Sequence, residues 1–78
     1  MLHEFSIAIR SFQDLQDFVS LATVQPFEVL VGNDRQQISG KSFMGMMSLD
    51  LQNPLRVAVC CSDEEFTQFH DGAARFCV

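Results

Sequence analysis

The sequence predicts an α+β protein in which three helices cover one face of a four-stranded, mostly antiparallel sheet. Segments that alternate apolar and polar residues are interspersed with segments whose apolar residues recur every three or four positions. Their order along the chain is strand, helix, strand, strand, helix, strand, helix. Each helical segment has one apolar face, and a two-layer open-faced sandwich buries all of these faces at once. We expect residues 1–78 to form a single domain with a modest core.

The first strand and the first helix follow from two clear periodicities. Residues 2–9 alternate apolar and polar side chains, which is typical of a strand with one buried face. Residues 12–23 carry apolar side chains at helical spacing, beginning with Phe12. Ser11 precedes this segment and is a favourable N-cap, so we expect the helix to begin there.

Two short strands and a short helix come next. The strand "FEVLV" at 27–31 is followed by "GNDR" at 32–35, which is typical of a hairpin turn, and by "QQIS" at 36–39. These two strands should therefore pair in antiparallel fashion. A short helix is expected over residues 42–48.

The fourth strand and the last helix end the chain. The strand is "LRVAVCC" at 55–61, whose β-branched residues favour extended backbone. Ser62 and Glu65 then have the spacing of a capping box, which predicts the start of a helix. The apolar face of this helix continues to Phe76.

Composition and charge exclude several classes of function. A formal net charge of −5 argues against binding to nucleic acid, since the few cations are scattered along the chain. No apolar run approaches the roughly 18–20 residues that a membrane span needs, and the N-terminus does not resemble a secretion signal, so we expect a cytoplasmic protein. The three cysteines form no C-x-x-C pair and no cluster with histidine, so no disulfide scaffold, metal site or cofactor is expected.

The segment "GKSFMGMMSLDL" is the most unusual part of the chain, because three of the four methionines lie within four residues. So short a helix cannot bury all of them. In one arrangement Met46 and Leu49 enter the core and the other apolar residues are scattered over the surface. In the arrangement that we favour, Phe43, Met44 and Met47 also form an exposed contact patch, for which the flexible and polarizable methionine side chain is well suited.

This segment resembles the HPr family, the small phosphocarrier proteins of the bacterial sugar phosphotransferase system. Gram-positive members carry a stretch close to "KSIMGVMSLGI" before the fourth strand. The identical positions here are Lys41, Ser42, Met44, Gly45, Met47, Ser48 and Leu49. The order of strands and helices agrees as well. The resemblance implies the HPr-like open-faced sandwich in a cytosolic protein of a Gram-positive-type bacterium.

The resemblance also draws attention to a missing residue. Family members have a histidine between the first strand and the first helix, in a pattern like "GxHxRPA", and it carries the phosphoryl group. This chain has "IRSFQDLQDF" at that point, so we expect no phosphoryl transfer and no enzymatic activity. Arg10 and Ser11 leave at most a weak anion site at the helix start. The alternative is a phosphocarrier with an atypical nucleophile, such as His70 or Ser11.

The second functional position implied by the resemblance is Ser42, at the start of the second helix. In the family, HPr kinase phosphorylates the corresponding serine, and the modified protein binds a transcriptional regulator. A phosphate adds about −1.5 to −2 charges, which the helix dipole favours by about 0.3–1 kcal/mol. Lys41 could hold the phosphate. A simple helix cap is the plainer interpretation of Ser42, and the two are compatible.

Together these observations predict a non-catalytic protein-binding module. Its partners would be proteins of the phosphotransferase or carbon-regulation system, such as HPr kinase and a transcriptional regulator, with neither nucleic acid nor membrane involved. The residues expected to contact the partner are Lys41, Phe43, Met44 and Met47, with phosphorylation of Ser42 as the switch. A diverged structural module that forms a homodimer is the remaining alternative.

Overall fold

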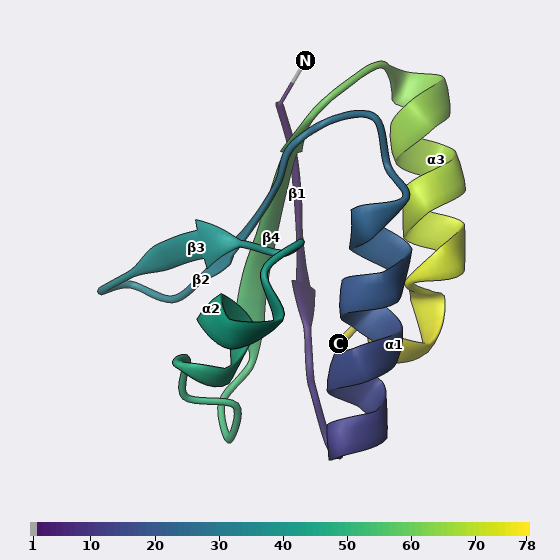
Figure 1. Ribbon diagram of the computed structural model, residues 1–78. Helices are drawn as coiled ribbons and strands as arrows, with labels where there is room; N and C mark the ends of the chain where they lie inside the picture. Colours follow the sequence, from purple (N-terminus) through teal and green to yellow (C-terminus); the bar gives the residue numbers. More distant parts are fainter. Residues whose placement is uncertain (1) are drawn as a thin grey trace.

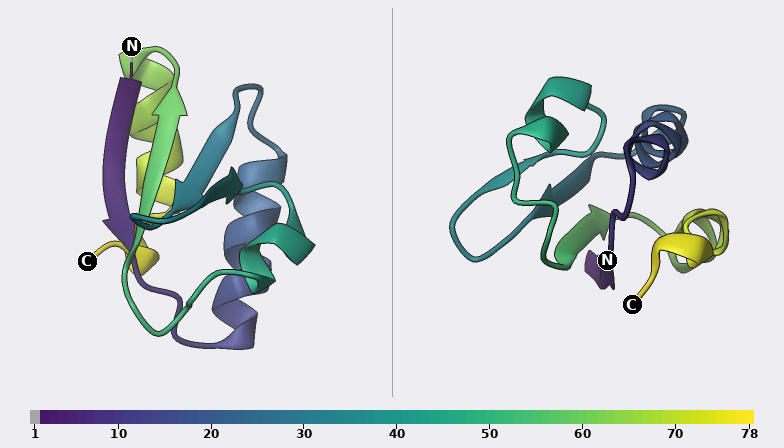
Figure 2. Two further views of the ribbon diagram at one scale, coloured as in Figure 1. Left: turned by 90° about the vertical axis from the view of Figure 1, so that its left-hand side faces the viewer. Right: turned by 90° about the horizontal axis from the view of Figure 1, so that it is seen from below.

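The computed structural model describes residues 2–78, and its strands and helices follow the predicted order (Figure 1). The elements are β1 (Leu2–Ile7), α1 (Phe12–Thr23), β2 (Val29–Gly32), β3 (Gln37–Ser39), α2 (Phe43–Met47), β4 (Leu55–Cys60), α3 (Asp63–Gly72) and the 3-10 helix η1 (Ala74–Phe76). The sheet has the order β1-β4-β2-β3, and every neighbouring pair is antiparallel. Figure 2 shows the three α-helices on one side of this sheet. The predicted open-faced α+β sandwich is confirmed.

The register of the central strand β4 decides which residues face the helices. Val59 pairs with His3 of β1 on one side and with Val29 of β2 on the other. Since side chains alternate along a strand, Val59 points toward the helices. Arg56 lies an odd number of positions away and is exposed on the open face of the sheet.

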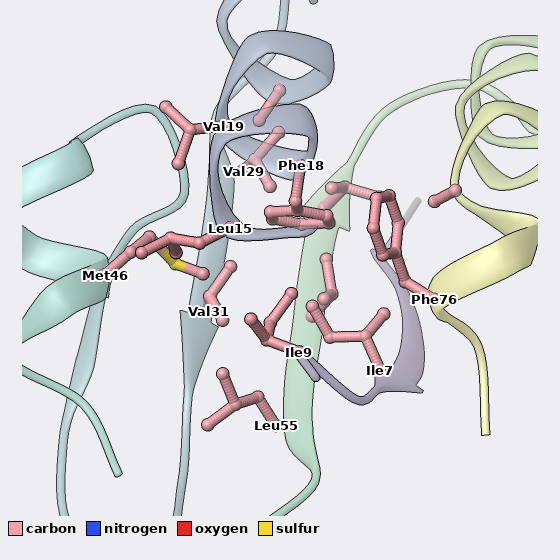
Figure 3. Packing of buried hydrophobic residues seen from close by; sticks show 14 of the residues in the cluster. Ile7, Ile9, Leu15, Phe18, Val19, Val29, Val31, Met46, Leu55 and Phe76 are labelled. Atoms are coloured by element: carbon pink, nitrogen blue, oxygen red, sulfur yellow. The ribbon is translucent and has the colours of Figure 1, made fainter. Parts of the chain in front are cut away.

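The core lies between the sheet and the three helices (Figure 3). Phe18 of α1 and Phe76 of η1 meet edge to face in it, with their ring centroids 5.7 Å apart. The α2 helix contributes Met46, which is completely buried, and Leu49 just beyond the helix is buried as well. The prediction that Met46 and Leu49 enter the core is therefore confirmed.

Several predicted boundaries were wrong by one or two residues, and the end of the chain differs more. β2 begins at Val29 rather than at residue 27, because its ladder with β4 begins at the pair Val29–Val59. The last α-helix ends at Gly72, a poor helix former, and does not continue to Phe76. The chain turns through η1 instead, and the N–H of Ala8 donates to the carbonyl of Phe76 at 2.7 Å. The C-terminus thereby returns to the edge of β1.

In the β2–β3 hairpin, the backbone of Gln36 lies very close to Gly32. A Cβ at this position would overlap the carbonyl oxygen of Gln36, so the turn requires glycine because of close approach and not because of an unusual φ. The Asn33 N–H donates to the same carbonyl at 2.9 Å. The side-chain oxygen of Asn33 also accepts the N–H groups of Arg35 and Gln36 at 2.9 and 3.0 Å. The hairpin turn predicted from "GNDR" is therefore present.

The stability of the protein is expected to fall in alkaline solution because of Cys61. Burial raises the pKa of this thiol above its ordinary value of 9.0, and the Glu65 carboxylate raises it further. The folded state therefore favours the neutral thiol, so the stabilisation is complete below the unfolded pKa of about 9 and is lost as the pH rises from there through the raised pKa of the folded state. Urea denaturation between about pH 7 and pH 10 should show this decline.

The control for this experiment is the Cys61→Ala variant. It lacks the titrating group and should lose less stability over the same pH interval. Part of the decline should persist, because burial also raises the pKa of Cys77. If the free energy of unfolding fell equally with pH in the original protein and in the variant, the assignment to Cys61 would be contradicted.

Candidate functional site

Ser42 is the N-cap of α2, as predicted. Its backbone is extended, its side chain is exposed, and its Oγ accepts the N–H of Gly45 at 3.0 Å. At the other end of the helix the Ser48 hydroxyl donates to the carbonyl of Gly45 at 2.6 Å. The cap interpretation of Ser42 is confirmed. Its phosphorylation stays a prediction.

Gly45 keeps the space beside the Ser42 hydroxyl open. A Cβ at position 45 would lie only 3.1 Å from the Ser42 Oγ. Glycine inside a helix costs about 1 kcal/mol relative to alanine, so local helix stability does not account for this choice. The glycine leaves the hydroxyl accessible from the side of the helix.

Lys41 is not placed as the sequence suggested. Its Nζ donates to the carbonyl of Gln25 at 2.8 Å, which ties α2 to the loop after α1. The side chain is half-buried along this path. To hold a phosphate on Ser42, the ammonium group would first have to leave Gln25.

The predicted contact patch is only partly exposed. Met44 is 78% and Met47 51% exposed, which separates them from the buried Met46 in the same helix. Phe43, in contrast, is half-buried and meets Phe12 edge to face, with ring centroids 5.7 Å apart. We name these four exposed or partly exposed residues, Phe12, Phe43, Met44 and Met47, the α1–α2 surface.

Phe12 is the member of this surface that sequence reasoning missed. Its position at helical spacing assigned it to the apolar face of α1, yet it is 58% exposed. Phe12 is the first residue of α1, directly after the Ser11 N-cap, and the buried residues of this helix begin only at Leu15. The only available signal was this terminal position.

A groove of about 340 Å³ runs between the start of α1 and the end of α2. It brings together two sets of predicted residues, since Arg10 and Ser11 lie along one wall and Met47 along the other. The remaining lining residues are mostly apolar: Ile9, Phe12, Leu15, Leu51 and Gln52. The groove therefore extends the α1–α2 surface into a concave, largely apolar depression.

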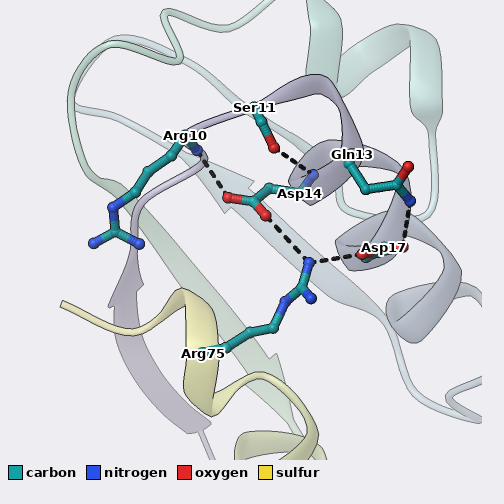
Figure 4. Close-up of polar contacts among 6 residues, drawn as sticks. All are labelled: Arg10, Ser11, Gln13, Asp14, Asp17 and Arg75. Atoms are coloured by element: carbon teal, nitrogen blue, oxygen red, sulfur yellow. Dashed lines mark hydrogen bonds and ion pairs between the residues drawn. The ribbon is translucent and has the colours of Figure 1, made fainter.

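The start of α1 already holds an acidic side chain (Figure 4). The Ser11 Oγ accepts the N–H of Asp14 at 3.1 Å, and a carboxylate oxygen of Asp14 accepts the N–H of Arg10 at 3.1 Å. Arg75 binds this same Asp14 at 3.1 Å and Asp17 at 2.6 Å. An external anion near Arg10 and Ser11 would compete with the Asp14 carboxylate, so the weak anion site stays a prediction.

His70, the histidine considered as an atypical nucleophile, lies on α3 among other rings. Its ring is edge to face with Phe5 at 5.0 Å, and its Nε2 lies 3.6 Å from the Cys77 sulfur. Burial raises the pKa of the Cys77 thiol and so keeps it neutral. His70 is not among the residues described along the groove between α1 and α2. Sequence reasoning could not have placed it, because its neighbours come from both ends of the chain.

Comparison with known proteins bears on the fold. No family model matches the sequence, and no curated protein matches it. Among solved structures, the chain is similar to HPr-C-His from Thermoanaerobacter tengcongensis, with a TM-score of 0.71 and 22% sequence identity, over 91% of this chain and 88% of that one. The protein therefore has the HPr-like fold that the resemblance implied.

None of the helices within residues 2–78 is long and apolar enough to cross a membrane. The same part of the chain contains no group of three or more histidine, cysteine or acidic side chains arranged to hold a metal ion.

Proposed function

We propose that the protein is a non-catalytic, HPr-like binding module related to the sugar phosphotransferase system. It docks a protein partner through the α1–α2 surface and the adjoining groove. The observation that carries this proposal is that the methionines of one short helix differ in exposure. Met46 is buried in the core, while Met44 and Met47 are exposed to solvent. Large, flexible apolar side chains left exposed next to an apolar groove favour contact with another protein.

Phosphorylation of Ser42 would regulate this docking. The hydroxyl is exposed at the edge of the α1–α2 surface, and Gly45 leaves room beside it. A phosphate would add about −1.5 to −2 charges next to Phe43 and Met44, which changes the surface that a partner meets without refolding the domain. The contact between Lys41 and Gln25 could also give way to an ion pair with the phosphate, which would free the loop after α1.

We expect HPr kinase and ATP to add one phosphoryl group to this protein, located at Ser42 by mass spectrometry of its peptides. The Ser42→Ala variant should incorporate none. Ser48→Ala is the matched control, since Ser48 is an exposed serine at the other end of the same helix, and it should be phosphorylated normally. The proposal of a Ser42 switch fails if the original protein remains unmodified or if Ser42→Ala is modified equally well.

A second arm of the same experiment uses enzyme I with phosphoenolpyruvate. No phosphoprotein should form, because the loop between β1 and α1 contains no histidine and the Ser11 hydroxyl caps the helix. An acid-labile phosphoprotein would instead favour a phosphocarrier and overturn the non-catalytic role.

A further inference from the structure

A second depression lies where the β2–β3 hairpin turn meets the loop before β4. Its volume is about 590 Å³, within the range of sites for small organic ligands. In Figure 1 this hairpin projects away from α1 and α3, so the depression belongs to another part of the molecule than the groove beside Phe12. The polar side chains along it include Ser6, Asn33, Arg35, Asn53 and Arg56.

Arg56 and Arg35 enter this depression from different elements. Arg56 comes from the open face of β4, where it pairs in register with Ser6 of β1 and with Gly32 of β2. Its two cross-strand neighbours are small, so little covers the guanidinium. Arg35 comes from the hairpin turn, in which the Asn33 side-chain oxygen accepts the N–H groups of Arg35 and Gln36. Two cations from separate elements thus line one concave surface.

The two arginines are also the cations that the fold leaves available there. Arg75 is held by two carboxylates, and the ammonium group of Lys41 donates to a carbonyl. Within residues 2–78 the guanidinium groups of Arg35 and Arg56 make neither a hydrogen bond nor an ion pair. In a chain with a net charge of −5, two arginines without an acidic partner thus line one depression.

The acidic residues nearby limit what that ligand can be. Asp50 uses both carboxylate oxygens locally, since it accepts the Gln52 N–H at 3.0 Å and the Asn53 side-chain amide at 2.8 Å. Asp34 lines the depression as well and is exposed. Glu4 lines the adjoining part of the open face next to Arg56. These carboxylates would repel a polyanion such as nucleic acid, whereas a small oxyanion can contact the arginines alone.

We propose that Arg35 and Arg56 form a binding site for a small organic oxyanion, a phosphate ester or a dicarboxylate. Guanidinium groups bind both with paired, charge-assisted hydrogen bonds. The volume exceeds that of a phosphate ion, which leaves room for an organic part of the ligand. This site is independent of the α1–α2 surface and of Ser42.

The test is a titration of the ¹⁵N-labelled protein with phenyl phosphate and with succinate at constant ionic strength. Saturable shifts of amide signals are expected around Gly32, Arg35 and Arg56 for at least one of the two probes. Arg56→Gln and Arg35→Gln should each weaken binding at least about tenfold. Arg75→Gln is the control, because it removes the same charge from an arginine that is held by Asp14 and Asp17 and does not line the depression, and it should bind as the original protein does.

The two probes also distinguish the ligand classes. Saturation by phenyl phosphate alone assigns a phosphate ester, and saturation by succinate alone assigns a dicarboxylate. Shifts that do not saturate with either probe would overturn the proposal. So would unchanged affinity in the Arg56→Gln and Arg35→Gln variants, or loss of binding in Arg75→Gln.

Discussion

Replacing Met46 by alanine is expected to lower the free energy of unfolding by about 2–5 kcal/mol. The side chain is completely buried in the core between α2 and the sheet, and its removal leaves a cavity that so small a protein can fill only in part. Urea denaturation, followed by circular dichroism, measures the loss as a lower midpoint with an unchanged slope. A domain of this size has a total stability of the order of 5–15 kcal/mol, so the variant should be close to unfolding at moderate temperature.

Met44→Ala is the matched control, two residues away in the same helix. Met44 is 78% exposed, so its truncation should change the free energy of unfolding by no more than about 0.5 kcal/mol. Equal losses in the two variants would show that α2 does not sit on the sheet with Met46 inward. The exposed patch proposed for docking would then have no basis.

The second large effect concerns binding. Changing both Met44 and Met47 to glutamine should raise the KM of HPr kinase for this protein at least about tenfold, with little change in kcat. Glutamine keeps the length and helix preference of methionine and removes its apolar end. Loss of a central apolar contact in an interface costs about 2 kcal/mol or more, which corresponds to a factor of at least ten.

Val24→Gln provides the control for this double variant. Val24 is also an exposed apolar residue, at 75%, but it lies at the far end of α1 from Phe12. The KM should stay as in the original protein. A similar rise in KM for Val24→Gln would mean that general surface hydrophobicity, and not the α1–α2 surface, controls recognition.

The sequence predicted the elements well wherever local chemistry determines them. The capping box of Ser62 and Glu65 is present, and the Asn33 turn joins two antiparallel strands. The phase of α2 was also predictable in part, because Met46 and Leu49 are three residues apart and share a face. Periodicity failed at the helix end near Gly72, where contacts of the C-terminal segment with β1 replaced the continuation of the helix.

The site depends on contacts between distant residues, and these were harder to predict. Lys41 reaches Gln25 only because the loop after α1 passes beside α2, and nothing in the sequence near Lys41 indicates this. Arg75 forms an ion pair with Asp14, 61 positions away in the chain, because η1 folds back against α1. Phe12 became part of the surface because it lies at the first turn of α1, beyond the edge of the core. In each case the tertiary arrangement, and not local spacing, decides the role of the residue.

The most direct test of the central claim, docking through the α1–α2 surface, is a footprint of HPr kinase on the ¹⁵N-labelled protein. We predict that the amide signals of Phe12, Ser42, Met44 and Met47 broaden or shift when the kinase is added without ATP. The signals around Arg56, on the open face of the sheet, should remain unchanged. A footprint centred on Arg56, or no footprint at all, would contradict the account.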